Sequence, residues 1–169
     1  KRRTSSSSGE VRAFSRGYEF SNQGFLQPPP SPRWKELALG EGRLRVEENL
    51  PVALAQKRGV SVAVLGLAID SEEGISDSDL IADRIADLIL SGNSLEAIDE
   101  YVLWLGGRFV LIAGCEDQWR IHVDAMASRS CYWTVRNKQL FAASHSALVA
   151  REIEEFSRKR AYWVLSNPD

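Results

Sequence analysis

Apolar residues follow two different spacings along the chain, and the spacing predicts which segments are strands and which are helices. Val60–Ile69 is a nearly continuous apolar run, typical of a strand buried on both faces, and Leu44–Val46 predicts another strand. Between them, Leu50–Gly59 is consistent with either a short strand or a turn. Earlier in the chain, Phe14–Phe25 has sparse apolar residues interrupted by Gly, and Gln27–Pro32 predicts a stiff polyproline II connector that ends any strand.

Helical spacing appears in three later segments. One helix opens near Ser76, which stands at capping-box spacing from Asp79, and Gly92 closes it. A second begins after Ser94 and ends at Gly106-Gly107, and a last one begins at about Ser146. The apolar positions of these helices are Leu80, Ile81, Ile85, Leu88 and Ile89 in the first, Leu95, Ile98, Val102 and Leu105 in the second, and Leu148, Val149, Ile153, Phe156 and Trp163 in the last.

Four segments before the last helix alternate or run apolar: Arg108–Cys115, Trp119–Asp124, Ser130–Val135 and Leu140–Ser144. Because short polar connections separate them, we predict one antiparallel meander. Its largely buried side chains should be Phe109, Leu111, Ile121, Val123, Trp133 and Phe141. In the second of these strands, the period of two places Trp119, Ile121 and Val123 on one face and Arg120, His122 and Asp124 on the other.

This order of elements predicts an α+β domain, a layered sandwich of antiparallel sheets and helices. A length of 169 residues suits one domain with a core that needs no disulfide or metal. Residues 1–13 form a charged, Ser-rich stretch that we expect to be a disordered tail, and residues 14–169 the single domain.

Composition narrows the range of partners. A net charge of -2 carries no electrostatic signature of nucleic-acid binding. The longest apolar runs are too short to cross a bilayer, and the first residues are charged with no apolar segment behind them. We therefore expect a cytoplasmic protein with neither a nucleic-acid nor a membrane partner.

Cysteine and histidine are too few to suggest a metal site. Cys115 and Cys131 have no zinc-type spacing and are expected to be buried free thiols, with a disulfide or a ligand role as the alternative. His122 and His145 have no third ligand with them. Ser144 precedes His145 directly, so we expect their side chains to diverge rather than form a nucleophile and its base. Neither a metal nor a cofactor is predicted.

Three later stretches together resemble a known family. They are Leu105-Gly-Gly-Arg-Phe109, Asp124-Ala-Met-Ala-Ser-Arg-Ser-Cys-Tyr-Trp133 and Phe141-Ala-Ala-Ser-His-Ser-Ala-Leu148. Their order and spacing are similar to those of the glutaminase-type domain of asparagine synthetases and other class II glutamine amidotransferases, which are N-terminal-nucleophile hydrolases. The family's stretches are Gly-x-Phe, Asp-Pro-x-Gly-x-Arg-Pro-Leu-Tyr-Tyr and Phe-Ala-Ser-Glu. The resemblance implies an N-terminal-nucleophile-hydrolase-like sandwich, and we expect its C-terminal part to be cut.

The resemblance also gives Asp124 and Arg129 a role. They look like the family's structural pair, an ion pair that holds the loop between two strands, which tolerates burial only if both partners are present. We expect the two side chains to be hydrogen-bonded to each other or to the backbone of their own loop. The alternative is that Arg129 faces a ligand.

The chain departs from the family where the family does its chemistry. The resemblance implies an N-terminal Cys whose α-amino group is the base, yet residue 1 is Lys and both cysteines lie in predicted strands. The family's Asn-Gly oxyanion hole resembles Leu65-Gly66 here, and Leu offers no side-chain donor, so only the backbone of Gly66 is left as a remnant. No catalytic residue is therefore assigned.

A further remnant is Asp77, because Ser76-Asp-Ser-Asp-Leu-Ile-Ala82 resembles the family stretch whose Asp holds the substrate's α-ammonium. Helix capping alone also selects Ser-Asp at a helix start, and we prefer that interpretation. The family's His-Arg-Gly-Pro-Asp stretch, whose Arg binds the substrate carboxylate, has no counterpart near Leu37 to Leu50.

We therefore expect a degenerate, non-catalytic glutamine amidotransferase-like domain of an asparagine synthetase-related protein. It would act as a scaffold or docking module for a downstream or separate ATP-dependent amide-forming domain. Two alternatives stay open: an active glutaminase whose Cys is absent from this sequence, and a free-standing binding module. The encoded residues before Lys1 and after Asp169 distinguish the three, and the oligomeric state and any ligase substrate are not predicted.

Overall fold

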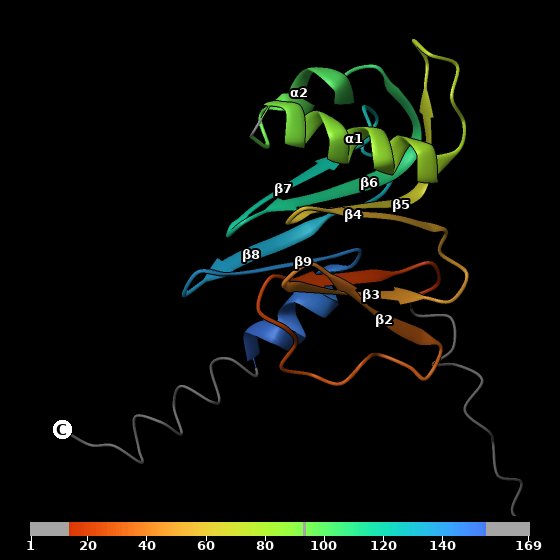
Figure 1. Cartoon of the computed structure of the whole chain (residues 1–169). Helices are drawn as coiled ribbons and strands as arrows, with labels where there is room; N and C mark the ends of the chain where they lie inside the picture. The colour runs from red at the N-terminus through yellow and green to blue at the C-terminus, as the bar shows by residue number, and fades with distance from the viewer. Residues whose placement is uncertain (1–13, 93, 155–169) are drawn as a thin grey trace, which may run out of the picture.

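Two antiparallel β-sheets lie face to face in the computed structural model, which describes residues 14–92 and 94–154 (Figure 1). The five-stranded sheet has the order β2-β3-β1-β9-β8, formed by β1 (Tyr18–Ser21), β2 (Trp34–Leu39), β3 (Gly42–Glu47), β8 (Tyr132–Arg136) and β9 (Gln139–Ala143). The four-stranded sheet has the order β4-β5-β6-β7, formed by β4 (Val52–Lys57), β5 (Val60–Asp70), β6 (Leu105–Cys115) and β7 (Gln118–Val123). Every pairing in both sheets is antiparallel.

Helices cover the outer face of each sheet, so the fold has four layers in the order helix, sheet, sheet, helix (Figure 1). α1 (Ser78–Gly92) and α2 (Ala97–Val102) lie on the four-stranded sheet, and the helical residues 146–154 lie on the five-stranded sheet. The prediction of an α+β sandwich of antiparallel sheets and helices is therefore confirmed at this level.

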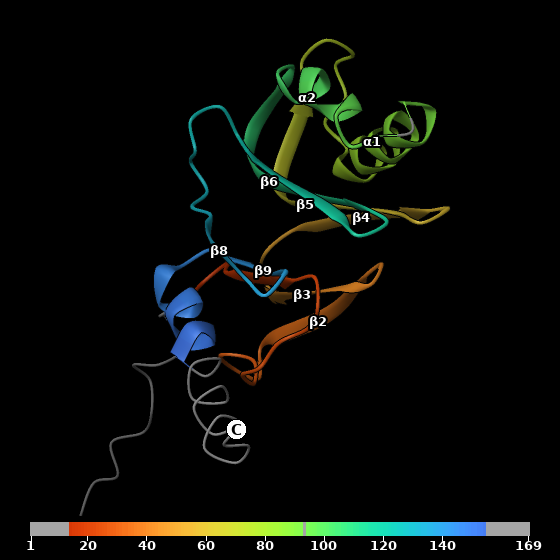
Figure 2. The same cartoon turned by 90° about the vertical axis from the view of Figure 1, so that its left-hand side faces the viewer.

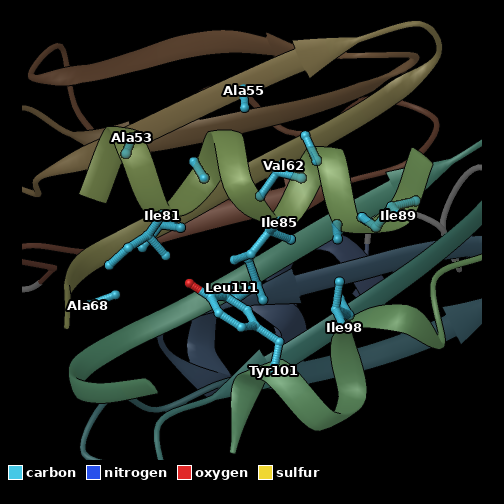
Figure 3. Packing of buried hydrophobic residues seen from close by; sticks show 14 of the residues in the cluster. Ala53, Ala55, Val62, Ala68, Ile81, Ile85, Ile89, Ile98, Tyr101 and Leu111 are labelled. Carbon is cyan, nitrogen blue, oxygen red and sulfur yellow. The ribbon is translucent and has the colours of Figure 1, made fainter. Parts of the chain in front are cut away.

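Isoleucine side chains attach α1 to the sheet beneath it (Figure 3). Ile81, Ile85 and Ile89 are completely buried and pack in one cluster with Val62 and Leu111 of the sheet. Their spacing matches the predicted stripe, whereas Leu80, which the prediction included, is 56% exposed. Burial of each such aliphatic side chain stabilises the folded state by about 1.5–3 kcal/mol, so this stripe is sufficient to hold the helix on the sheet.

Two further clusters join the remaining layers. Between the sheets, Phe20 and Leu65 are fully buried, and the ring of Phe20 lies 4.7 Å from that of Trp119. Below the five-stranded sheet, Leu148 and Val149 pack against Phe141. The two faces predicted for Trp119–Asp124 are consistent with these contacts, since Trp119 and Ile121 join the cluster between the sheets and Arg120 pairs with Asp99 of α2.

The prediction of a single meander between Arg108 and Ser144 is wrong. β6 pairs with β7 and β8 pairs with β9, but the two hairpins belong to different sheets. The connection through residues 124–131 crosses from one sheet to the other (Figure 2). This connection is long enough to reach the other sheet. There β9 pairs with β1 on one edge and with β8 on the other, and local periodicity does not reveal this arrangement.

Because the two hairpins belong to different sheets, only some of the six predicted core residues are buried. Phe109, Leu111 and Phe141 are buried, and Ile121 is half-buried. Val123 is 36% exposed and Trp133 is 67% exposed, so the prediction is wrong for these two. Their strands, β7 and β8, are edge strands of separate sheets, where fewer neighbours cover a side chain.

The second helix is shorter than predicted. α2 ends at Val102, and Gly106-Gly107, predicted to stop the helix, instead lies in β6 paired with Ile69 and Ala68. At Gly107 the backbone has φ of 111°, and an added Cβ would lie 2.3 Å from the carbonyl of Leu67. Glycine is therefore needed for a close strand approach and not for a helix end.

Predicted strands near Leu44–Val46 and Val60–Ile69 are confirmed as β3 and β5, and β4 resolves the choice left open for Leu50–Gly59. β1 and β2 were not predicted.

The proposed tail at residues 1–13 and the helix positions Phe156 and Trp163 lie outside the described residues. In the described part of the chain, no helix is both long and apolar enough to span a membrane.

Candidate functional site

A cavity of about 210 Å³ lies beside the start of β1, where four separate segments meet. The segments are the turn before β1, the N-terminal part of β6, the β7–β8 connection and the end of β9. Its lining residues are Ser15, Arg16, Tyr18, Arg108, Ser128, Arg129, Ser130, Ser144 and His145. Among the residues that the structure describes, the lining holds three arginines, four serines and no carboxylate.

The turn before β1 presents Arg16 to this cavity. The backbone N–H of Gly17 donates to the carbonyl of Phe14 at 3.0 Å. Arg16 has φ of 52°, a backbone conformation uncommon for residues other than glycine. The backbone N–H of Arg16 donates to Oε2 of Glu47 at 3.1 Å. Burial would raise the pKa of Glu47, but hydrogen bonds from Arg16 and Asn49 lower it below the ordinary value. A fixed carboxylate therefore holds the turn in place.

The β7–β8 connection is organised by Asp124, which is 3% exposed. Its carboxylate accepts the N–H groups of Met126 at 3.2 Å, Ser128 at 3.0 Å and Arg129 at 3.3 Å, and the Ser128 hydroxyl lies 2.9 Å from both carboxylate oxygens. Burial would raise the pKa of Asp124, but these hydrogen bonds lower it. Asp124 thus shapes its own loop, as predicted.

The Arg129 guanidinium does not form the expected ion pair with Asp124. Its Nε donates to the carbonyl of Arg108 at 3.3 Å, and Nη1 lies 3.5 Å from the carbonyl of Arg16. The guanidinium thus joins β6 to the turn before β1. Asp124 and Arg129 therefore stabilise different contacts, because backbone N–H groups already occupy the acceptor positions of the Asp124 carboxylate.

Three positive charges therefore gather around the cavity. Burial lowers the pKa of Arg129, and the charges of Arg108 and Arg16 lower it further. Nε of Arg108 donates to the carbonyl of Ser128 at 3.1 Å. Among residues 14–92 and 94–154, no carboxylate lies within ion-pair distance of any of the three guanidinium groups.

Ser144 and His145 contact each other, contrary to the expectation that they diverge. Oγ of Ser144 lies 2.8 Å from Nδ1 of His145 and accepts the backbone N–H of Tyr18 at 3.0 Å. The bend after β9 allows this, because the two residues no longer follow strand geometry. Burial lowers the pKa of His145, and no carboxylate in the described part of the chain is hydrogen-bonded to it. The pair fastens β9 to β1, and it lacks the acid that orients a catalytic histidine.

Gly66 lies beside the site, but its N–H is not available as a remnant oxyanion donor. It donates to the carbonyl of Pro51 at 2.8 Å. With φ of 110°, an added Cβ would lie 2.5 Å from Nε of Arg129, so Gly66 leaves room for that side chain. Leu65 is completely buried in the core between the sheets.

Asp77 does not line the cavity. Its carboxylate accepts the N–H of Asp79 at 2.9 Å and caps α1, which begins at Ser78. This agrees with the preferred capping interpretation. The proposed capping box from Ser76 is wrong, because Asp77 occupies the cap and takes the Asp79 N–H.

Neither cysteine is in a disulfide, and both are half-buried rather than buried as expected. Burial raises the pKa of Cys131, which contacts Tyr18 next to the cavity, so its thiolate is disfavoured. The described residues contain no cluster of three or more His, Cys, Asp or Glu side chains suited to a metal ion.

Sequence reasoning did not identify Arg16 or Arg108 as site residues. Arg16 stands in a segment with little periodicity, and Arg108 is an exposed position at the edge of a glycine pair. No pattern in either place signals that they converge with Arg129. Comparison with models of known protein families finds no match, and the search of curated proteins finds no match either.

Proposed function

We propose that this chain is a glutamine amidotransferase-like domain that does not hydrolyse glutamine and serves as a scaffold or docking module. Its partner would be an ATP-dependent amide-forming domain of an asparagine synthetase-related protein, downstream or on a separate chain. A cytoplasmic location and the absence of nucleic-acid and membrane partners are part of the proposal.

One observation carries the proposal. The residues that lead directly into β1 beside the cavity are Phe14, Ser15, Arg16 and Gly17. The family resemblance requires a Cys with a free α-amine in such a place, because the amine takes the thiol proton during attack. Arg16 offers neither group, and its backbone N–H is bound to Glu47.

The layered fold and the surroundings of Gly66 support the same conclusion. Two face-to-face sheets between helices agree with the sandwich that the resemblance implies. An oxyanion hole needs donors aimed at the developing charge, and losing one typically costs about 10²–10³ in rate. Here Leu65 has no polar group and the Gly66 N–H already has an acceptor.

The test is ammonia release from millimolar glutamine by the purified chain, with an established glutaminase as the positive control. A second form begins at position 16 with Arg16→Cys, which places both a thiol and a free amine at the cavity. No turnover above background is expected from the unaltered chain. Turnover by that chain would overturn the proposal and favour an active enzyme.

The docking role is tested on the parent protein. If the encoded sequence continues beyond Asp169 into an ATP-dependent synthetase domain, deletion of residues 14–154 should lower the yield of folded synthetase or its amide-forming rate. An unchanged synthetase would contradict the scaffold role and favour a free-standing binding module.

A further inference from the structure

We propose that the cavity beside β1 binds a small dianionic oxyanion of the phosphate class, such as the phosphate group of a small phosphorylated molecule. The inference goes beyond the proposed function and does not depend on it, because it rests on the charges and hydrogen-bond donors around the cavity.

Positive charge at this site comes from three segments that are far apart in the sequence. Arg16 precedes β1, Arg108 belongs to β6, and Arg129 lies in the β7–β8 connection. Like charges held together disfavour one another, and burial increases that cost for Arg129. In the described part of the chain no carboxylate forms an ion pair with them. An incoming anion would supply the missing counter-charge.

The nearby carboxylates are fully engaged elsewhere. Asp124 accepts hydrogen bonds from its own loop, and Glu47 accepts the N–H groups of Arg16 and Asn49 and the amide of Asn49. These bonds hold both carboxylates in fixed positions. Neither is available to swing in and neutralise the guanidinium groups.

The remaining polar side chains of the cavity include groups that can donate a hydrogen bond. Hydroxyl groups come from Ser15 and Ser130, whereas the Ser128 hydroxyl already donates to Asp124. The Ser144 hydroxyl and the His145 imidazole, whose Nδ1 lies 2.8 Å from Ser144 Oγ, add two further polar groups to the lining. The described part of this lining has cations and hydroxyl groups but no Asp or Glu, which suits an oxyanion and disfavours a cation or an apolar group.

Size and charge favour phosphate over a carboxylate. The cavity of about 210 Å³ is smaller than the roughly 300–1,000 Å³ typical of sites for drug-sized ligands, so it suits a compact group. A carboxylate brings one charge and two oxygens, whereas a phosphate monoester brings up to two charges and three oxygens. Three arginines match the phosphate better, because it brings more charge and one more oxygen to accept their hydrogen bonds.

The experiment titrates the full chain with inorganic phosphate at constant ionic strength and follows binding by calorimetry and by the melting temperature. Constant ionic strength is essential because salt screens exposed charges. Parallel titrations use sulfate, O-phosphoserine and L-glutamate. Phosphate should bind with a dissociation constant of about 1 mM or tighter, and O-phosphoserine should bind at least as tightly. Glutamate should bind more weakly than phosphate.

Two variants locate the site and one serves as a matched control. Arg16→Gln and Arg108→Gln should each weaken phosphate binding about tenfold, since each removes a charge-assisted contact. Arg58→Gln is the control, because Arg58 is also exposed, also has a positive φ of 46° and lies in the β4–β5 turn. It should change the affinity by less than about twofold. Melting curves without ligand verify that each variant is folded, and Arg16→Lys, which retains the charge, should bind with intermediate affinity.

Three outcomes would overturn the proposal: no saturable phosphate binding, equal weakening by Arg58→Gln, or glutamate binding more tightly than phosphate. The last would point instead to an amino-acid site. None of these results depends on glutamine hydrolysis, so the failure of this inference and that of the proposed function are separately recognisable.

Discussion

Asp124 accepts the backbone N–H of Arg129 at 3.3 Å, while the Arg129 guanidinium turns away and donates to the carbonyl of Arg108. The two residues are five positions apart, yet they stabilise different parts of the molecule. Asp124 holds the β7–β8 connection in shape, and Arg129 fastens that connection to β6 and to the turn before β1. Each can therefore be tested alone.

Replacing Asp124 should destabilise the domain through its loop. In Asp124→Asn the side chain has one acceptor oxygen instead of a carboxylate, so several buried N–H groups lose a partner. We expect the free energy of unfolding to fall by about 2–3 kcal/mol. Urea unfolding at pH 7 measures it, with Asp117→Asn in the β6–β7 turn as the exposed control.

The effect of Asp124 should also depend on pH. Because its folded pKa lies below its ordinary value of 3.8, the carboxylate contributes stability above pH 3.8 and loses that contribution as pH falls further. The difference between the wild type and the variant should therefore shrink in strong acid. A difference that stays constant would contradict this account.

Replacing Arg129 should loosen the contact between β6 and the turn before β1. Arg129→Met leaves the carbonyls of Arg108 and Arg16 without this donor, and we expect a loss of roughly 1–3 kcal/mol. The melting temperature is the measurement, and Arg58→Met is the control for loss of an exposed arginine. An unchanged melting curve would argue against the structural role.

Glu19 should make stability fall as pH rises towards neutrality. Its side chain is 1% exposed on β1, and burial raises its pKa to about 7, although Arg45 and Arg151 act against burial and Glu152 acts with it. Between its ordinary pKa of 4.5 and about 7, the folded chain retains a proton that the unfolded chain releases. Stability is therefore full below pH 4.5 and decreases as pH rises through that window, by at most about 3 kcal/mol.

Glu19→Gln removes that titration while keeping the size of the side chain. The variant should become more stable than the wild type as pH rises from 5 to 8, and Glu41→Gln, at an exposed turn, should show no such trend. Chemical unfolding across this pH range provides the comparison. If the free energy of unfolding varied with pH in the same way in the variant and the wild type, burial would not raise the pKa of Glu19 and the prediction would be wrong.

Tyr101 should anchor α2 through a single buried hydrogen bond. Its hydroxyl donates to Oδ2 of Asp70 at 2.6 Å, and Asp70 also accepts the N–H groups of Glu72 and Glu73. Tyr101→Phe should cost about 1.5–3 kcal/mol, the usual range for a hydrogen bond to a charged group. Tyr132→Phe, at a 46% exposed position, is the matched control and should be neutral in the same melting experiment.

The elements that the sequence predicts well are those whose periodicity is long. β5 and α1 have long runs or repeated stripes that tertiary context does not override. β1 has only four residues, one of which is Glu19, so nothing local identifies it as a fully buried central strand. Gly106-Gly107 has the composition of a helix end, and only the strand pairing with Ala68 and Ile69 shows why glycine is needed there.

The candidate site was predictable only in part for a similar reason. Asp124 and Arg129 stand at a recognisable spacing, so their loop was identified before the partners were known. Arg16 and Arg108 enter the cavity through pairings between distant segments, which a single sequence does not specify. The contact between Ser144 and His145 depends on a bend that strand geometry excludes.

The position of β1 in the five-stranded sheet has a consequence for the order in which a newly synthesised chain can fold. β4 to β7 pair only with their neighbours in sequence, so the four-stranded sheet can be complete once Val123 has emerged from the ribosome. β1, the first of the described strands, can pair with β3 early, but its other edge must wait for β9. The cavity contains residues on both sides of that late pairing, so it should form only after β9 has joined β1, and a chain that stops before Ala143 should lack it.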